Sequence, residues 1–109
     1  MQRVAPQLNE AIEELDFETV QIFIEHEFKP DFRITATGIT IYSLLMGVDI
    51  KALENTEDGK NRYIHTLKKL KKKRPDFNIT DDFGRNCFHH AASADNFLGL
   101  QFTIQVYND

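Results

Sequence analysis

The residues with the clearest chemical potential lie together in the stretch GRNCFHHAA, between Gly84 and Ala92. Cys87, the only cysteine of the chain, stands two residues before His89 and three before His90. Thiolate and imidazole are common zinc ligands, and a cysteine with a histidine base is one form of catalytic nucleophile. The stretch is therefore a candidate metal site, a candidate active site, or a structural segment without chemistry of its own.

The spacing of these residues argues against the first two possibilities. The sequence has no second cysteine, and no other close pair of ligands has the spacing of a zinc site. Neighbouring side chains on a helix point about 100° apart, so Cys87 and the two histidines would not converge on one atom. We therefore predict no metal, no cofactor and no enzymatic activity.

Length and composition indicate one globular domain. A chain of 109 residues suits a single domain, and 41% hydrophobic with 28% charged residues is ordinary for a globular protein. One cysteine excludes an internal disulfide, and no apolar run is long enough to span a bilayer. The simplest location is intracellular, in the cytoplasm or the nucleus, with no membrane as partner.

A short motif occurs twice. KPDFRIT begins at Lys29 and RPDFNIT at Arg74, so five of seven positions are identical at an offset of 45 residues. Each copy is soon followed by a glycine, Gly38 or Gly84, and then by a segment with helical periodicity. A motif, a glycine and a helical segment that recur in this order predict stacked supersecondary units.

Helical periodicity of apolar residues marks most of the chain. The predicted helices are 7–15, 17–27, 41–47, 62–73 and 86–93. Asp16 is a good N-cap for the second of these, and residues 55–61 are polar enough to predict a loop. The last segment, LQFTIQVY, alternates as a strand would, but we assign it to a helix because helix pairs follow the other turns.

This arrangement resembles the ankyrin repeat, whose pattern runs D-x-x-G-x-T-P-L-H-x-A-A before a second helix. The matching residues are Asp81, Gly84, His89, Ala91 and Ala92. Asn86 and Cys87 replace the threonine and proline of the pattern, and the middle unit keeps Gly38 but has Ser43 in place of the histidine. The resemblance covers nearly the whole chain and is strong only in the last third.

The resemblance implies an all-α fold, a short solenoid of stacked antiparallel helix pairs joined by hairpin-like turns. One domain, 1–109, would hold repeats at about 5–31, 32–76 and 77–109. Because the family period is about 33 residues, the middle repeat needs an insertion near 49–60. The resemblance also implies that His89 is a buried hydrogen-bonding residue that ties the turn to its helix, and that the chain binds other proteins.

We accordingly predict a non-catalytic interaction module that binds a partner protein through turn tips and inner helices. The predicted contacts are Thr37, Ile39, Tyr42, Met46, Phe83, Arg85, His90 and Ala94. Phe83 is the strongest of them, because an aromatic residue at a turn tip has no role in a core. The alternatives are packing of Phe83 between neighbouring turns and an exposed His90 without a role.

The C-terminal segment is apolar on nearly every side, although terminal repeats normally have a polar outer face. We predict further repeats or self-association at this end. The residues of this candidate interface are Phe97, Leu98, Phe102, Ile104 and Tyr107. The alternative function is therefore a structural subunit, or a fragment of a larger assembly, that uses its C-terminal end as the interface.

The basic run KKLKKKR, at 68–74, ends a predicted helix, where cations interact favourably with the helix dipole. The simplest interpretation is a solvated helix end, and a nuclear-import signal or a phosphate-binding patch are the alternatives. Leu70 interrupts the run and no aromatic cluster accompanies it. These features argue against nucleic-acid binding as the main function.

Overall fold

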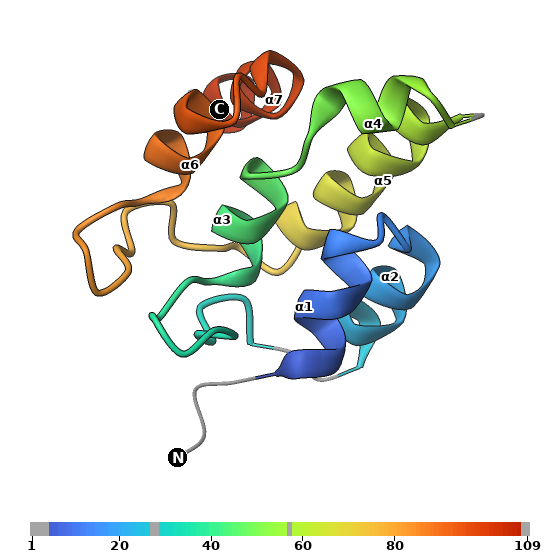
Figure 1. Cartoon of the computed structure of the whole chain (residues 1–109). Helices are drawn as coiled ribbons and strands as arrows, with labels where there is room; N and C mark the ends of the chain where they lie inside the picture. The colour runs from blue at the N-terminus through green and yellow to red at the C-terminus, as the bar shows by residue number, and fades with distance from the viewer. Residues whose placement is uncertain (1–4, 27–28, 57, 108–109) are drawn as a thin grey trace.

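Seven helices form the regular structure of residues 5–26, 29–56 and 58–107, the parts that the computed structural model describes (Figure 1). They are α1 (Pro6–Glu13), α2 (Phe17–Glu25), α3 (Ile41–Met46), α4 (Ile50–Glu54), α5 (Gly59–Lys71), α6 (Cys87–Ser93) and α7 (Phe97–Tyr107). These ranges contain no β-strand, only an isolated antiparallel bridge between Arg33 and Thr40. The prediction of an all-helical chain is confirmed, including a helix for the ambiguous last segment.

Capping side chains mark the start of five of the described helices, with Asn96 at the start of α7. The Asp16 carboxylate accepts hydrogen bonds from the backbone N–H of Thr19, at 3.3 Å, and from its hydroxyl, at 2.6 Å, which confirms the predicted N-cap of α2. Thr40, Asp49 and Asn86 cap α3, α4 and α6 in the same way. These side chains therefore satisfy backbone N–H groups that have no partner within the helix itself.

The helix bounds differ from the prediction mainly in the middle of the chain. Helix α4 lies within the predicted insertion, and α5 begins at Gly59, three residues before the predicted start, so the loop prediction for 55–61 is partly wrong. The early start depends on packing, because Gly59 lies so close to the end of α4 that a Cβ would lie 2.5 Å from the carbonyl oxygen of Leu53. Glu27, the predicted end of α2, and Glu57, within the predicted loop, lie outside the described residues.

Two series of helices run through the molecule (Figure 1). Helix α3 packs against both α1 and α6, and α5 packs against both α2 and α7. The series are joined because α1 packs on α2, α3 on α5 and α6 on α7, while α4 lies on α5. The whole body measures 38 × 27 × 24 Å.

Three hydrogen bonds join residues that are 45 positions apart, and two of them involve side chains. The backbone N–H of Asp76 donates to the carboxylate of Asp31 at 3.0 Å, and these residues hold the same place in the two PDF motifs. The side-chain amide of Gln21, on α2, donates to the hydroxyl of Thr66, on α5, also at 3.0 Å. The 45-residue spacing of the repeated motif in the sequence is therefore also the spacing between residues that form hydrogen bonds in the fold.

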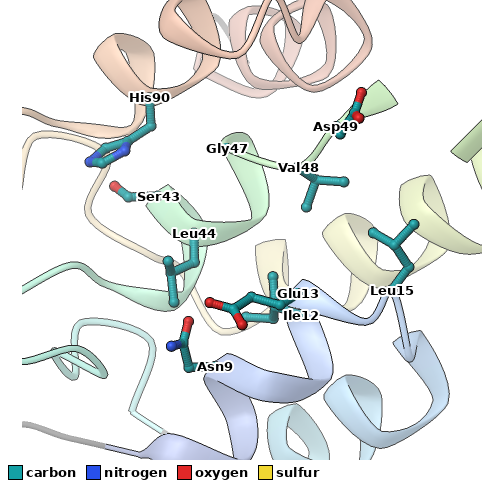
Figure 2. Close-up of a pocket in the computed structure, with 10 residues that line it drawn as sticks. All are labelled: Asn9, Ile12, Glu13, Leu15, Ser43, Leu44, Gly47, Val48, Asp49 and His90. Carbon is teal, nitrogen blue, oxygen red and sulfur yellow. The ribbon is translucent and has the colours of Figure 1, made fainter. Parts of the chain in front are cut away.

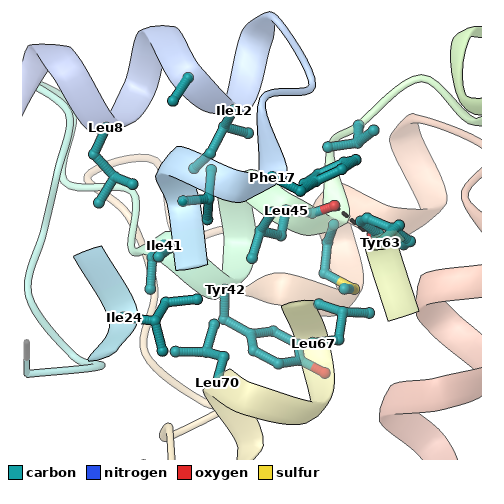
Figure 3. Packing of buried hydrophobic residues seen from close by; sticks show 14 of the residues in the cluster. Leu8, Ile12, Phe17, Ile24, Ile41, Tyr42, Leu45, Tyr63, Leu67 and Leu70 are labelled. Carbon is teal, nitrogen blue, oxygen red and sulfur yellow. Dashed lines mark hydrogen bonds between the residues drawn. The ribbon is translucent and has the colours of Figure 1, made fainter. Parts of the chain in front are cut away.

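A hydrophobic core runs between the two series, with Leu, Ile and Tyr side chains at its centre (Figure 3). Tyr63 is buried among them and its hydroxyl donates to the carbonyl oxygen of Leu45 at 2.6 Å, the dashed line of Figure 3. The buried Asn96 amide donates to the carbonyl oxygen of Met46 at 2.9 Å and to the Tyr63 hydroxyl at 2.8 Å. Polar groups in the core are thus paired with one another.

Candidate binding surface

A buried carboxylate organises the turn 81–85. The side chain of Asp81 is 1% exposed, and its Oδ1 accepts hydrogen bonds from the backbone N–H of Phe83, at 2.9 Å, and of Arg85, at 3.0 Å. Its Oδ2 accepts one from Nε of Arg85 at 2.9 Å and lies 3.1 Å from Nε2 of His90. Gly84 closes the turn with a φ of 77°, in the left-handed region that favours glycine. The turn is therefore held in one conformation from several sides.

The ionised form of Asp81 is the stable one. Burial by itself raises the pKa of this carboxyl group, but the hydrogen bonds from Arg85, Phe83 and His90 outweigh that effect and lower the pKa to about 2. At neutral pH the turn therefore encloses a negative charge that Arg85 balances.

Phe83 and Arg85 form the outer surface of this turn. The Phe83 side chain is among the most exposed large hydrophobic groups of the described residues, at 68%. The guanidinium carbon of Arg85 lies 5.1 Å from the centroid of the Phe83 ring, within cation–π distance. Because Asp81 fixes Arg85 and Arg85 lies over the ring, the exposed aromatic side chain is held in place by a buried group.

His90 connects the turn to a hollow of about 360 Å³ between α1, α3 and α6. Its imidazole bonds to Asp81 on one side and borders the hollow on the other, pointing toward Ser43 (Figure 2). The lining residues are Asn9, Ile12, Glu13, Leu15, Ser43, Leu44, Gly47, Val48, Asp49 and His90. The hollow therefore combines an aliphatic surface with two carboxylates, those of Glu13 and Asp49.

Two predicted contact residues are corrected by the structure. Tyr42 is 2% exposed and Met46 is 1% exposed, so neither side chain is available at the surface. Both belong to α3, which is covered on several sides by α1, α5, α6 and α7. The helix was expected to present these residues to a partner, but its apolar face is wider than the sequence pattern indicated.

The remaining predicted contacts are only partly accessible. Thr37 and Ile39 flank Gly38 and are half-buried. The carbonyl oxygen of Thr37 accepts a hydrogen bond from the backbone N–H of Asp82 at 2.9 Å. Ala94 is half-buried and lines a different hollow, next to α4. The structure therefore brings Phe83, Arg85 and His90 together, links Thr37 to them through the backbone, and places Ala94 elsewhere.

The residues predicted to be structural have different environments. His89 is exposed, so its predicted burial is wrong, but its Nδ1 accepts a hydrogen bond from the backbone N–H of Asn86 at 3.1 Å and so holds the helix start. Gly38 has a φ of 83° and Ala91 is buried against the core, whereas Ala92 is exposed. His89 does not need burial because it completes a capping box at the surface.

Cys87 has the properties of a core residue. Its side chain is buried, its Sγ donates to the carbonyl oxygen of Phe77 at 3.5 Å, and burial raises the pKa of the thiol to about 12. A thiol that stays protonated is a poor nucleophile and a poor metal ligand. Among the described residues no three His, Cys, Asp or Glu side chains come close enough to hold a metal ion.

Helix α7 carries the second exposed apolar surface. Phe97 is 73% exposed and Ile104 is 46% exposed, and both line a shallow hollow with Leu100. Leu98 and Phe102 are half-buried and pack against the core. Of the five residues predicted for a C-terminal interface, Phe97, Ile104 and Tyr107 are therefore exposed.

Comparisons with protein-family models, with curated proteins and with solved structures give no match for this chain. Within the described ranges, no helix is long and apolar enough to cross a membrane. Function must accordingly be inferred from the geometry of the chain's own side chains.

Sequence reasoning did not assign a site role to Asp81, to Asn9 on α1, or to Asp49. A signal for Asp81 was present, because an aspartate three residues before a turn glycine commonly accepts hydrogen bonds from the backbone that follows it. The hollow had no such signal, since its lining comes from helices whose packing the sequence pattern does not define.

Proposed function

We propose that the chain is a non-catalytic, intracellular interaction module, an ankyrin-like stack of helix pairs that binds a partner protein through the turn 81–85 and the adjoining hollow. The observation that carries this proposal is the exposed Phe83 ring, held under Arg85 by a buried carboxylate. Aromatic and arginine side chains are enriched among residues that dominate binding energy. A side chain fixed before binding loses little entropy when the complex forms.

The repeat contacts support the stacked arrangement. The hydrogen bonds from Asp76 to Asp31 and from Gln21 to Thr66 join positions that are 45 residues apart. The series α1–α3–α6 and α2–α5–α7 have the neighbour relations expected of three helix pairs placed side by side. In such a stack the turn 81–85 and the hollow lie where successive units can contribute to one surface.

The hollow next to His90 supports the same partner class. An aliphatic wall with carboxylates at Glu13 and Asp49 suits a side chain with an apolar stem and a positive end, as in lysine or arginine. The partner would place such a side chain in the hollow while it covers Phe83. Burial of the Phe83 ring would contribute binding energy, and burial of the partner's basic side chain would make the surface selective for positive charge.

The test is capture of binding proteins from native lysate with the intact chain and two double variants. Phe83→Ala/Arg85→Ala removes the surface of the turn, and Phe97→Ala/Ile104→Ala is a matched control that removes exposed apolar groups from α7. A partner that binds the intact chain and the α7 variant, but not the turn variant, supports the proposal. Equal capture by the intact chain and the turn variant contradicts it.

The exposed surface of α7 favours one alternative, a structural subunit of a larger assembly. Phe97, Ile104 and Tyr107 place three large apolar side chains in contact with solvent on one helix. If this surface is the interface, the α7 variant loses the partner and the turn variant keeps it. The same experiment therefore separates the two functions.

A further inference from the structure

The fold divides the basic run 68–74 between two surfaces. Lys69 forms an ion pair with Glu25 of α2, and Leu70 is fully buried in the core. The other side of the run lines a groove of about 500 Å³ between α5 and α7. The groove residues are Lys68, Lys71, Lys72, Arg74 and Phe102. We call this feature the basic groove.

The described side chains that line the basic groove carry charge of one sign. Among the described residues, no carboxylate lines the groove and no Asp or Glu forms an ion pair with Lys68, Lys71, Lys72 or Arg74. The chain as a whole has a net charge of −4, so this positive charge is a local concentration. The carboxyl end of α5 offsets part of the repulsion among these cations through the helix dipole. A bound anion would offset more of it, because grooves concentrate the electrostatic potential of their lining charges.

The Phe102 ring, which forms the apolar wall of the groove, limits which anions the groove can bind well. Phe102 comes from α7, packs against the core with one side and lines the groove with the other. A ligand that fills this space places apolar atoms against the ring as well as negative charge among the lysines. Free phosphate satisfies only the second requirement.

We propose that the basic groove binds an acidic segment of a partner protein that carries one large apolar side chain. Carboxylates of the segment would pair with Lys68, Lys71, Lys72 and Arg74, and its apolar side chain would contact Phe102. Single-stranded nucleic acid fits less well, because it needs successive rings for stacking and the groove offers one. The five groove residues are absent from the turn 81–85 and from the hollow beside His90, so this proposal stands or falls separately from the proposed function.

The experiment is fluorescence anisotropy with the full chain and short labelled probes at low and at physiological ionic strength. The probes are a peptide of glutamates around a central leucine, the same peptide with alanine in place of leucine, the glutamine analogue of the first peptide, and a single-stranded RNA. We expect the glutamate–leucine peptide to bind most tightly, with an affinity that falls as salt rises. A tighter complex with RNA, equal affinity for the glutamine analogue, or no binding would overturn the proposal.

Two variants localise the binding. Lys71→Glu/Lys72→Glu should weaken the complex about tenfold or more, because two attractions become repulsions. Lys29→Glu/Lys51→Glu makes the same change in net charge at exposed positions outside the groove and should change the affinity far less. Phe102→Leu keeps a bulky apolar residue and should reduce the preference for leucine over alanine in the peptide without abolishing binding. Equal weakening by both lysine variants would show an effect of net charge alone and would contradict the groove.

Discussion

The hydroxyl groups of Tyr42 and Thr103 lie 2.7 Å apart in the interior and join α3 to α7 across 61 residues of sequence. Thr103 also donates to the carbonyl oxygen of Gly99 at 2.8 Å, within its own helix. Burial raises the pKa of the Tyr42 hydroxyl above its ordinary value, so the group remains a neutral donor. This contact explains why a residue with a surface-like polar end is placed inside the molecule.

Replacement of Tyr42 by phenylalanine should therefore affect stability and leave partner binding unchanged. Tyr42→Phe removes one buried hydrogen bond and should lower the free energy of unfolding by about 1 kcal/mol. The measurement is urea unfolding followed by circular dichroism, with the exposed Tyr107→Phe as the control. A loss of partner binding at unchanged stability would return Tyr42 to the binding surface.

The amide of Asn96 should contribute more than the Tyr42 hydroxyl. It donates to Met46 and to Tyr63, and its oxygen accepts from the backbone N–H of Gly99 at 2.8 Å near the start of α7. Asn96→Ala removes these three buried hydrogen bonds and should cost about 2–4 kcal/mol. The same denaturant experiment checks it, with the exposed Asn61→Ala expected to stay within about 0.5 kcal/mol of the parent chain.

Two glycine-to-alanine substitutions should differ. A Cβ at Gly99 would lie 2.7 Å from both the Asn96 amide nitrogen and the Tyr63 hydroxyl, whereas a Cβ at Gly47 would have only ordinary contacts of 3.5 Å and longer. Gly99→Ala should therefore destabilise the fold by about 1–3 kcal/mol, although alanine is the better helix former. Gly47→Ala should be nearly neutral by thermal unfolding. Equal midpoints for both variants would show that α7 can shift to admit a methyl group.

The low pKa of Asp81 gives a pH-dependent prediction. The ionised carboxylate stabilises the fold above the ordinary pKa of 3.8, and this contribution is lost as the pH falls from 3.8 to about 2, the pKa in the folded chain. Asp81→Asn should lower the free energy of unfolding by about 1–3 kcal/mol at neutral pH. The gap between parent and variant should narrow below pH 3.8, since all other carboxyl groups are common to both chains. A gap that is independent of pH would exclude ionisation as its cause.

The sequence pattern located most helices because their apolar spacing and caps are local. The start of α2 behind Asp16 and the boundaries of α3 are examples. Helix α4 escaped prediction because its five residues have too little periodicity to stand out, and its place depends on packing against α5. The early start of α5 depends on a close approach at Gly59 that only the folded chain defines.

Of the candidate binding surface, only the turn 81–85 could be predicted from the sequence. Phe83 and Arg85 could be identified because a turn motif surrounds them, and the turn motif is local. The burial of Tyr42 could not, because helix α3 is covered on more sides than an amphipathic pattern suggests. The lysines of the basic run face either α2 or α7, and the sequence alone does not show where these two helices lie.

The buried position of Cys87 gives the chain a built-in kinetic probe. The side chain starts α6, lies against the core, and is the only thiol of the sequence. A water-soluble disulfide reagent can therefore react only when α6 opens locally or the whole chain unfolds. The rate of thiol labelling, divided by the rate in denaturant, would report how often α6 opens. A partner bound to the turn 81–85 should slow the labelling.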